Sequence, residues 1–401
     1  MRSWSTMCHR TPSSPAWSPI PNRIPSPRQA IMSPLDFTPS ERGSLGIEWE
    51  VALVDSQTRA LASGAPAVLS RLGATKDGPL RGEYLTCMVE LVTGVHSIVG
   101  AAVAELRADL DRLASAADAE GLAVYAAGTH PFSRAADVQV ERGPSYDTVA
   151  EQNAWWARRM LICGTHLHVG VPDRELTMPL VHGLAQLSPL LLALTASSPF
   201  FEAEDTGFDS QRTMLFQQLP TNGLPPDLHD WTAFEAYYDQ IAAAKMVSGP
   251  SEIRWDVRPA PKFGTVELRV TDASPTLTEI GCLAAWAQCL TEYIIDGELS
   301  GAPLPSLAPW FVRENKWRAA RYGLAADLIT TDGSLPMREA VAQWHTRLAP
   351  YADRWGCRSA LDRALVLCAE GNSAERQRAI AADADLLTVV DAVCAETKEA
   401  L

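Results

Sequence analysis

The chain has 401 residues, 47% of them hydrophobic and 20% charged, which is an ordinary composition for a soluble globular protein. Its formal net charge of −14 argues against a general nucleic-acid or membrane-surface binder, because both of those partners are polyanions. The eight cysteines include no Cys-x-x-Cys pair, so free thiols in a reducing cytoplasm are favoured over disulfides or zinc ligands. No apolar run reaches the ~18 residues of a membrane span, and residues 184–196 are predicted to form a core helix.

Residues 1–39 differ in composition from the rest of the chain. They hold eight of the 28 prolines and four arginines, with no acidic residue before Asp36. Such a segment cannot bury enough apolar surface to order itself, so we predict a disordered extension. It lacks the apolar central region of a secretory signal, and Met32 is an alternative start site.

Residues 40–401 are predicted to form a single domain with its strands early and most of its helices late. Apolar patterning predicts strands at 44–55, 88–93, 121–127, 162–171, 252–257 and 264–271. Helical spacing predicts helices at 96–120, 147–160 and 180–196 and through most of 277–401, with breaks at 301–309, 331–336 and 371–372. Because strict alternation of strands and helices is absent, an α+β fold with an antiparallel sheet is favoured.

Two of the predicted strands carry ionisable side chains at period-two spacing. Glu48 and Glu50 would project from one strand face, and so would His166 and His168 on another strand. Adjacent carboxylates among apolar neighbours repel each other unless a cation lies between them. The alternatives are a solvent-facing acidic edge for the glutamates and ordinary core or surface positions for the histidines.

A further acidic pair, Glu83 and Glu90, favours the metal-site interpretation. Glu90 interrupts the apolar run 88–92, where an unpaired carboxylate is costly. Mg²⁺ prefers oxygen ligands, whereas no cysteine here has the spacing of zinc ligands. The combined carboxylates and histidines therefore indicate a hard-cation site rather than a zinc site.

The last acidic candidate, Glu267, has three arginines near it in the sequence. Glu267 and Arg269 share a strand face, and Arg254 and Arg258 precede them in the segment IRWDVRP. A structural Glu–Arg pair would explain the two strand residues alone. Beside metal-binding carboxylates, Arg258 and Arg269 are also suited to bidentate contacts with phosphate or with a substrate carboxylate.

Seven segments in order resemble the glutamate–cysteine ligase type 2 family of carboxylate–amine ligases. They are GIEWEVALVD, GEYLTCMVELVTGVH, AAGTHPFS, CGTHLHVGV, SPFFEAEDTGFDSQRTM, IRWDVRPAPKFGTVELRVTD and RENKWRAARYGL. The resemblance extends from about Ser44 to Leu324, and three segments are distantly similar to glutamine synthetase. It implies a curved antiparallel β-sheet of the glutamine synthetase type, flanked by helices and followed by a helical C-terminal part.

The resemblance also implies roles for individual residues. One cation would be held by Glu48, His166 and Glu267, and a second by Glu50, Glu83 and Glu90. Arg258 and Arg269 would be the catalytic arginines, and His168, Arg254, Arg258 and Arg269 would contact the nucleotide. Trp49, between the two metal-binding glutamates, should point away from the cations.

The implied reaction is ATP- and Mg²⁺-dependent amide formation through an acyl-phosphate, with Mn²⁺ as an alternative ion. Glutamate and cysteine are the expected amino-acid substrates, and a different carboxylate and amine pair is the alternative. A metal-dependent hydrolase and a non-catalytic binding module are the competing classes. We expect a cytoplasmic homo-oligomer, a dimer, with no nucleic-acid or membrane partner. A lid is expected at 221–226 or 133–145, and the general base is not identified.

Overall fold

The computed structural model describes residues 35–141, 151, 153–157 and 159–399. Most of the predicted disordered extension, residues 1–34, lies outside the described residues. The remaining five residues make specific contacts. The Phe37 ring lies 5.4 Å from that of Trp231, and the Thr38 N–H donates to the Pro261 carbonyl at 3.1 Å. The packed chain therefore begins before the predicted boundary at residue 39, because apolar side chains there reach the core.

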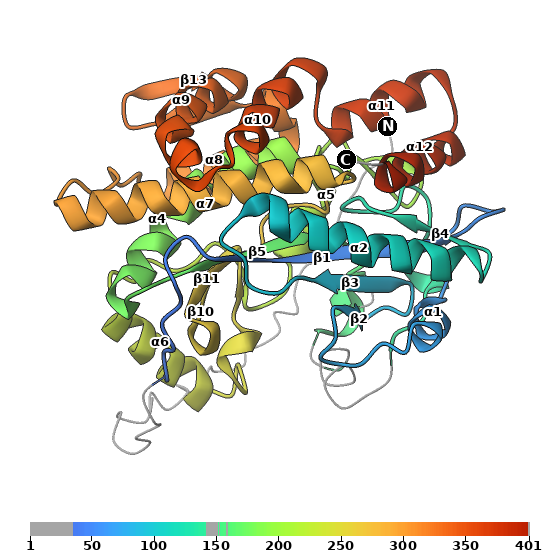
Figure 1. Ribbon diagram of the computed structural model, residues 1–401, viewed down its shortest axis with the longest axis horizontal. Coiled ribbons are helices and arrows are strands. Elements are labelled where there is room, and N and C mark those ends of the chain that lie inside the picture. Colours follow the sequence, from blue (N-terminus) through green and yellow to red (C-terminus); the bar gives the residue numbers. More distant parts are fainter. Residues whose placement is uncertain (1–34, 142–150, 152, 158, 400–401) are drawn as a thin grey trace, which may run out of the picture. The chain divides into compact units, whose positions relative to one another are not determined.

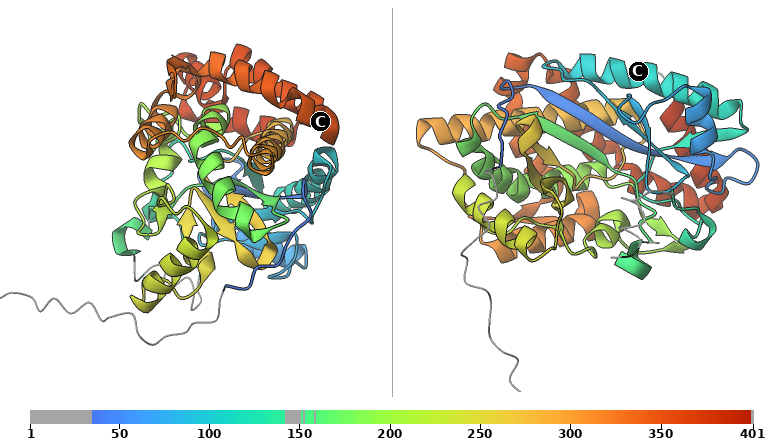
Figure 2. Two further views of the ribbon diagram at one scale, coloured as in Figure 1. Left: turned by 90° about the vertical axis from the view of Figure 1, so that its left-hand side faces the viewer. Right: turned by 90° about the horizontal axis from the view of Figure 1, so that it is seen from below.

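Seven strands form one antiparallel sheet in the order β10-β11-β5-β1-β3-β2, and β4 pairs with the end of β1 (Figure 1). These strands are β1 (Leu45–Asp55), β2 (Leu80–Gly82), β3 (Met88–Val92), β4 (Leu122–Tyr125), β5 (Thr165–Gly170), β10 (Val257–Ala260) and β11 (Thr265–Leu268). Figure 2 shows β1 in blue and β5 in green running side by side from below. The predicted antiparallel sheet is confirmed.

Helices make up most of the remaining structure. They are α1 (Ala65–Arg71), α2 (Val99–Asp118), α4 (Thr177–Thr195), α5 (Gln211–Phe216), α6 (Trp231–Ala243), α7 (Leu277–Ser300), α8 (Pro309–Tyr322), α9 (Met337–Trp355), α10 (Arg358–Glu370), α11 (Ser373–Asp383) and α12 (Leu386–Lys398). The predicted helical C-terminal part and the α+β class are confirmed. The predicted helix at 147–160 falls partly outside the described residues, and 153–157 are helical.

The two faces of the sheet have opposite chemistry. Trp49, Leu167 and Val266 lie on one face, and each is at most 1% exposed. Helices α2, α7 and α4 pack against this apolar face (Figure 1). The prediction that Trp49 points away from Glu48 and Glu50 is confirmed, because side chains alternate along a strand.

Helix α4 is longer than its sequence suggested. Residues 174–195 are long and apolar enough to cross a membrane by length and composition, and 78% of the apolar window is buried within the fold. The stretch 184–196, predicted as a core helix, corresponds to the C-terminal part of this longer helical segment, which begins before Leu180. Its burial agrees with the predicted core helix.

The remaining short strands are β2 and three two-stranded pairs. The pairs are β6 (Phe200–Phe201) with β7 (Glu204–Asp205), β8 (Asn222–Gly223) with β9 (Arg254–Trp255), and β12 (Asp327–Thr330) with β13 (Gly333–Pro336). Strand β9 lies within the strand predicted at 252–257, and the others lie outside the predictions. The last pair interrupts the helical C-terminal part. The Asn315 side chain supports it by donating to the Ile329 carbonyl and accepting from the Ile329 N–H, each at 2.8 Å.

Helix α8 is joined to the sheet region by a buried ion pair. The Lys316 ammonium lies 2.7 Å from the Asp256 carboxylate, and both side chains are at most 4% exposed. Asp256 links β9 to β10, and its carbonyl accepts from the Arg269 N–H at 2.7 Å. The segment RENKWRAARYGL thus supports the turn that carries the arginines.

His130, in the segment AAGTHPFS, organises a loop as a neutral side chain. Its Nε2 donates to the Arg59 carbonyl at 2.9 Å, and its Nδ1 accepts from the N–H groups of Phe132 and Ser133 at 3.3 and 3.0 Å. Burial lowers the pKa of His130 from 6.5 to about 4. Protonation would remove the acceptor that these two N–H groups use.

We expect Lys316→Met to destabilise the fold by about 3–5 kcal/mol, because it leaves the Asp256 carboxylate buried without its partner. The measurement is urea unfolding of the wild type, the single variant and the double variant Asp256→Asn/Lys316→Met. The double variant should recover most of the loss. A single variant within about 1 kcal/mol of wild type would show that the pair contributes little.

We expect His130 to make stability depend on pH. Its pKa is lower in the folded state than in the unfolded state, so its contribution is present above pH 6.5 and is lost as the pH falls toward 4. The full loss is about 3 kcal/mol. Urea unfolding between pH 7.5 and 5 should show a smaller decrease for His130→Asn, which keeps an acceptor but does not titrate. Equal decreases in both proteins would contradict this assignment.

Candidate functional site

The polar face of the sheet gathers ionisable side chains from four strands. Glu48 of β1 lies opposite His166 of β5, and His168 of β5 lies opposite Glu267 of β11. On the other side of β1, Glu50 lies opposite Glu90 of β3. Antiparallel register therefore brings these carboxylates and histidines together from distant parts of the sequence.

The first group consists of Glu48, His166 and Glu267, whose candidate ligand atoms all lie within 4.8 Å of one another. His166 Nδ1 is 3.4 Å from a Glu48 carboxylate oxygen. His166 and Glu267 are almost fully buried. This is the set of residues that the sequence analysis expected at one cation.

The second group consists of Glu50, Glu90 and His166, again within 4.8 Å. His166 Nε2 is 4.0 Å from a Glu50 oxygen, so each ring nitrogen faces a different carboxylate. A neutral imidazole has one lone pair and can ligate one cation only. Glu83, expected in this group, follows β2 and does not belong to the compact set of ligand atoms.

Glu83 is nevertheless close enough to interact with the acidic groups electrostatically. Burial, together with the charge of Glu50, raises the pKa of Glu83 to about 7. Burial and the charge of Glu83 raise the pKa of Glu90 to about 10. A bound cation would lower both pKa values, because it would place positive charge beside the buried carboxylates. Oxygen donors with one imidazole fit Mg²⁺ or Mn²⁺.

Glu267 is held between two arginines. Arg258 Nε donates to one carboxylate oxygen at 2.6 Å, and Arg269 donates to the other. Burial alone would raise the pKa of Glu267, but the charges of Arg269 and Arg258 outweigh it and lower the pKa to about 2. The predicted contact between Glu267 and Arg269 is present. Both expected catalytic arginines therefore bind this one carboxylate.

Arg254 has a different environment. Its side chain forms no ion pair with a carboxylate among the described residues, and it lies near Arg258 and Arg269. Burial and the charges of Arg269 and Arg258 lower the pKa of Arg254. A guanidinium beside two others, without its own carboxylate, is suited to an anion such as phosphate.

Arg212 of α5 is a site residue that the sequence analysis did not single out. It is 2% exposed, its Nη2 lies 3.4 Å from His166 Nε2, and its Nη1 donates to the Arg269 carbonyl at 3.2 Å. It forms no ion pair with a carboxylate within the part of the chain that the structure describes. Its place in SPFFEAEDTGFDSQRTM was the only available signal, because α5 is distant in sequence from every other site residue.

A buried carboxylate, Asp272, holds the segment that carries Arg212. Asp272 accepts from the hydroxyls of Ser198 and Ser210 at 2.6 and 2.7 Å and from the Ser197 N–H at 3.0 Å. The Ser198 hydroxyl in turn accepts from the Arg212 N–H at 3.0 Å. This network fixes the start of α5 against the end of β11.

His168, which was expected to contact the nucleotide, lies beside two carboxylates of the first group. Its Nδ1 is 2.8 Å from the Thr265 hydroxyl, and its Nε2 is 3.4 Å from Glu48 and 3.7 Å from Glu267. Its hydrogen-bonding partners therefore belong to β1 and β11. The expected nucleotide contact stays a prediction.

The model of the glutamate-cysteine ligase family 2 matches residues 44–385. The chain belongs to this family. The resemblance seen in the seven sequence segments is confirmed, and the family match also includes α9, α10 and α11.

Curated family relatives match almost the whole chain. "Putative glutamate--cysteine ligase 2-2" of Nocardia farcinica is 43% identical over 378 residues, covering 91% of this chain and 98% of the relative. "Putative glutamate--cysteine ligase 2" of Leifsonia xyli is 42% identical over 357 residues, covering 87% and 94%.

Two solved structures share the fold at low sequence identity. Glutamate–cysteine ligase of Francisella tularensis in complex with AMP has a TM-score of 0.68 at 13% identity, covering 91% of this chain and 90% of that one. A bifunctional glutathione synthetase from Pasteurella multocida has a TM-score of 0.63 at 14% identity, covering 88% and 52%. Both comparisons support the fold class predicted from the sequence.

Of the two segments expected to form a lid, the structure describes 221–226 completely and 133–145 only in part. Residues 221–226 include β8 and line a cavity, and residues 142–145 of the second segment lie outside the described residues. Neither assignment as a lid is tested by these positions, so both stay predictions.

We expect Gly164→Ala to disturb the site, because an added Cβ would lie 2.2 Å from Arg212 Nη2 and 2.9 Å from His166 Nε2. Overpacking of this kind costs about 1–3 kcal/mol. The matched control is Gly100→Ala, where nothing lies within 4 Å. Thermal unfolding should show a loss of stability for Gly164→Ala only. Equal melting temperatures for both variants would contradict the packing of Arg212 against His166.

Proposed function

We propose that the protein is an ATP- and Mg²⁺-dependent carboxylate–amine ligase that joins glutamate to cysteine. The observation that carries the proposal is an acidic group on one sheet face that lies close to guanidinium groups without a carboxylate partner among the described residues. Family membership and the names of the relatives support the same reaction class. The proposed product is γ-glutamylcysteine.

Divalent cations would be held by the carboxylates of the polar face. Glu48, His166 and Glu267 would hold one, and Glu50 and Glu90 would hold the other, with Glu83 close enough to add its negative charge. Bound Mg²⁺ supplies charge neutralisation for phosphoryl transfer. With Nδ1 of His166 committed to the first group, its Nε2 carries the proton, and Arg212 must then turn from His166 toward another acceptor.

The arginines provide the positive charge that the transferred group and the substrate carboxylate require. Arg254 and Arg212 have no carboxylate partner among the described residues, so they can bind anions without first breaking an ion pair. Arg258 and Arg269 are held by Glu267 and orient their guanidinium groups along the same face. We assign Arg254 and His168 to the nucleotide, and Arg258 and Arg269 to the transferred phosphoryl group.

The reaction joins two groups that do not react directly in water. The γ-phosphoryl group of ATP passes to the side-chain carboxylate of glutamate, which leaves ADP and an acyl-phosphate. The cysteine amine attacks the acyl carbon, phosphate departs and one proton is released. The protein must orient the reactants and exclude water from the acyl-phosphate. We further propose a cytoplasmic homodimer that uses small-molecule substrates.

The test incubates purified protein with MgATP, glutamate and cysteine, and follows ADP release and γ-glutamylcysteine formation together. Product that requires both amino acids and Mg²⁺ is the expected result. ADP release that depends on another carboxylate and amine would retain the ligase chemistry and replace the substrate pair. Absence of ATP turnover across a broad panel of carboxylates and amines would overturn the proposal.

We expect Glu48→Gln to remove nearly all ATP turnover, by roughly 10²-fold or more, because it weakens the first cation site. Mg²⁺ should raise the melting temperature of the wild type more than that of this variant, which keeps only the second cation site intact. The control is Glu175→Gln, which alters an exposed carboxylate. Glu267→Gln should also lose turnover, but it leaves two arginines without their carboxylate and should lose stability as well. Wild-type turnover in Glu48→Gln would contradict the metal assignment.

A further inference from the structure

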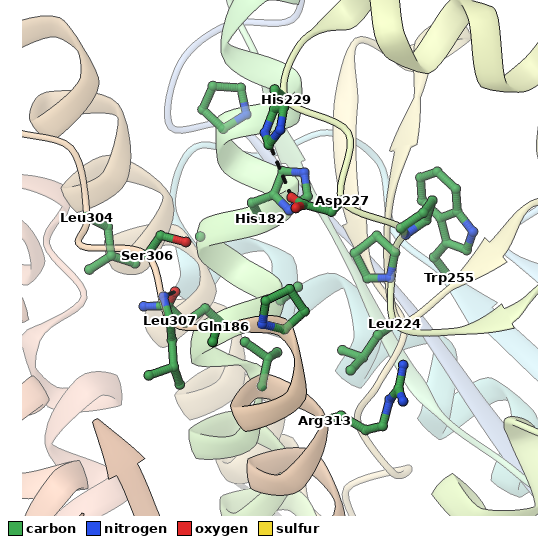
Figure 3. Close-up of a pocket in the computed structure, with 18 of the residues that line it drawn as sticks. His182, Gln186, Leu224, Asp227, His229, Trp255, Leu304, Ser306, Leu307 and Arg313 are labelled. Atoms are coloured by element: carbon green, nitrogen blue, oxygen red, sulfur yellow. Dashed lines mark hydrogen bonds and ion pairs between the residues drawn. The ribbon is translucent and has the colours of Figure 1, made fainter. Parts of the chain in front are cut away.

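A cavity of about 920 Å³ lies outside the acidic face (Figure 3). Its walls come from α4, the 220–229 segment, β9, the end of α7 and the 304–313 segment. None of the glutamates, histidines or arginines assigned above lines it. Its size is in the range of small-molecule binding sites.

Two side chains of α4 hold the cavity walls in place. His182 Nε2 donates to the Leu228 carbonyl at 2.6 Å and so fixes the 220–229 segment. One turn later, Gln186 donates to the Pro305 carbonyl at 2.9 Å and accepts from the Leu307 N–H at 2.8 Å, which fixes the opposite wall. The cavity is therefore maintained by specific hydrogen bonds from one helix.

The lining combines apolar surface on both walls with opposite charges at separate places. Leu224, Leu304 and Leu307 contribute apolar surface. Figure 3 shows Arg313 on one side of the cavity, and Asp227 with His182 and His229 on the other. Arg313 has no ion pair among the described residues, and the nearest partner of Asp227 is the exposed His229, at 3.8 Å.

The charge balance of the lining restricts the class of ligand. Arg313 is its only arginine or lysine, whereas Asp227 and Glu298 are both acidic. His182 donates its Nε2 proton to a carbonyl, so its Nδ1 is free to accept a hydrogen bond in the neutral state. A polyanion such as a nucleotide is therefore disfavoured. A ligand with one carboxylate and one ammonium group matches both sides.

We propose that this cavity is a second ligand site that binds a short zwitterionic peptide with apolar side chains. The carboxylate pairs with Arg313, and the ammonium group is bound on the side of Asp227. Leucine-sized side chains contact the apolar surface of the two walls. This binding requires neither ATP nor a divalent cation, so it can be measured separately from the proposed ligase reaction.

The test is isothermal titration calorimetry with the dipeptide Leu-Leu in the absence of nucleotide and metal. Its two blocked forms, N-acetyl-Leu-Leu and Leu-Leu amide, each lack one charge. We expect Leu-Leu to bind and each blocked form to bind at least about tenfold more weakly. No binding of Leu-Leu at 10 mM (about the weakest affinity such a titration detects), or equal affinity of the three peptides, would overturn the proposal.

Variants locate the binding in this cavity. Arg313→Gln should reduce the affinity for Leu-Leu to that of the wild type for the amide, and leave the affinity for the amide unchanged. Arg318→Gln is the matched control, since Arg318 lies on the same helix, pairs with Glu314 and does not line the cavity. Glu48→Gln should bind Leu-Leu as the wild type does. Loss of binding in Glu48→Gln but not in Arg313→Gln would place the peptide on the acidic face and refute the cavity site.

Discussion

The register of β1 is the constraint on which the site depends. This strand pairs with β3 on one edge and with β5 on the other, which brings Glu50 opposite Glu90 and Glu48 opposite His166. A shift of one residue would exchange the two faces and place Trp49 among the carboxylates. It would also bury Glu48 and Glu50 against the helices. Apolar packing on one face therefore fixes the positions of the charges on the other.

Only some of the charged side chains at the polar face form ion pairs with each other. Glu267 is neutralised by two arginines, whereas burial and neighbouring carboxylates raise the pKa values of Glu83 and Glu90. On the other side, Arg254 and Arg212 have no carboxylate partner among the described residues. One part of the face thus lacks positive charge and another lacks negative charge. Phosphoryl transfer needs a cation site and free guanidinium groups next to each other, because both neutralise the negative charge of the transferred phosphoryl group.

The sequence predicted the features that depend on short-range periodicity or on a contiguous motif. The alternation in GIEWE and THLH predicted which side chains share a strand face, and the structure has that arrangement. Arg212 was missed because only tertiary contacts bring α5 to His166. The pairing of Lys316 with Asp256 was missed for the same reason. The β12–β13 hairpin was missed because its four-residue strands depend on Asn315 of α8 rather than on their own pattern.

The cavity and the arginines of the polar face share two structural supports. Arg254 and Trp255 are adjacent on β9, so they face opposite sides of the strand, and Trp255 lines the cavity. Arg313 lies one turn before Lys316 on α8, and Lys316 holds Asp256 immediately after β9. A buried ion pair of this kind does not lengthen without a large cost. Any displacement of α8 by an occupant of the cavity must therefore move the Asp256 turn, whose carbonyl holds the backbone of Arg269.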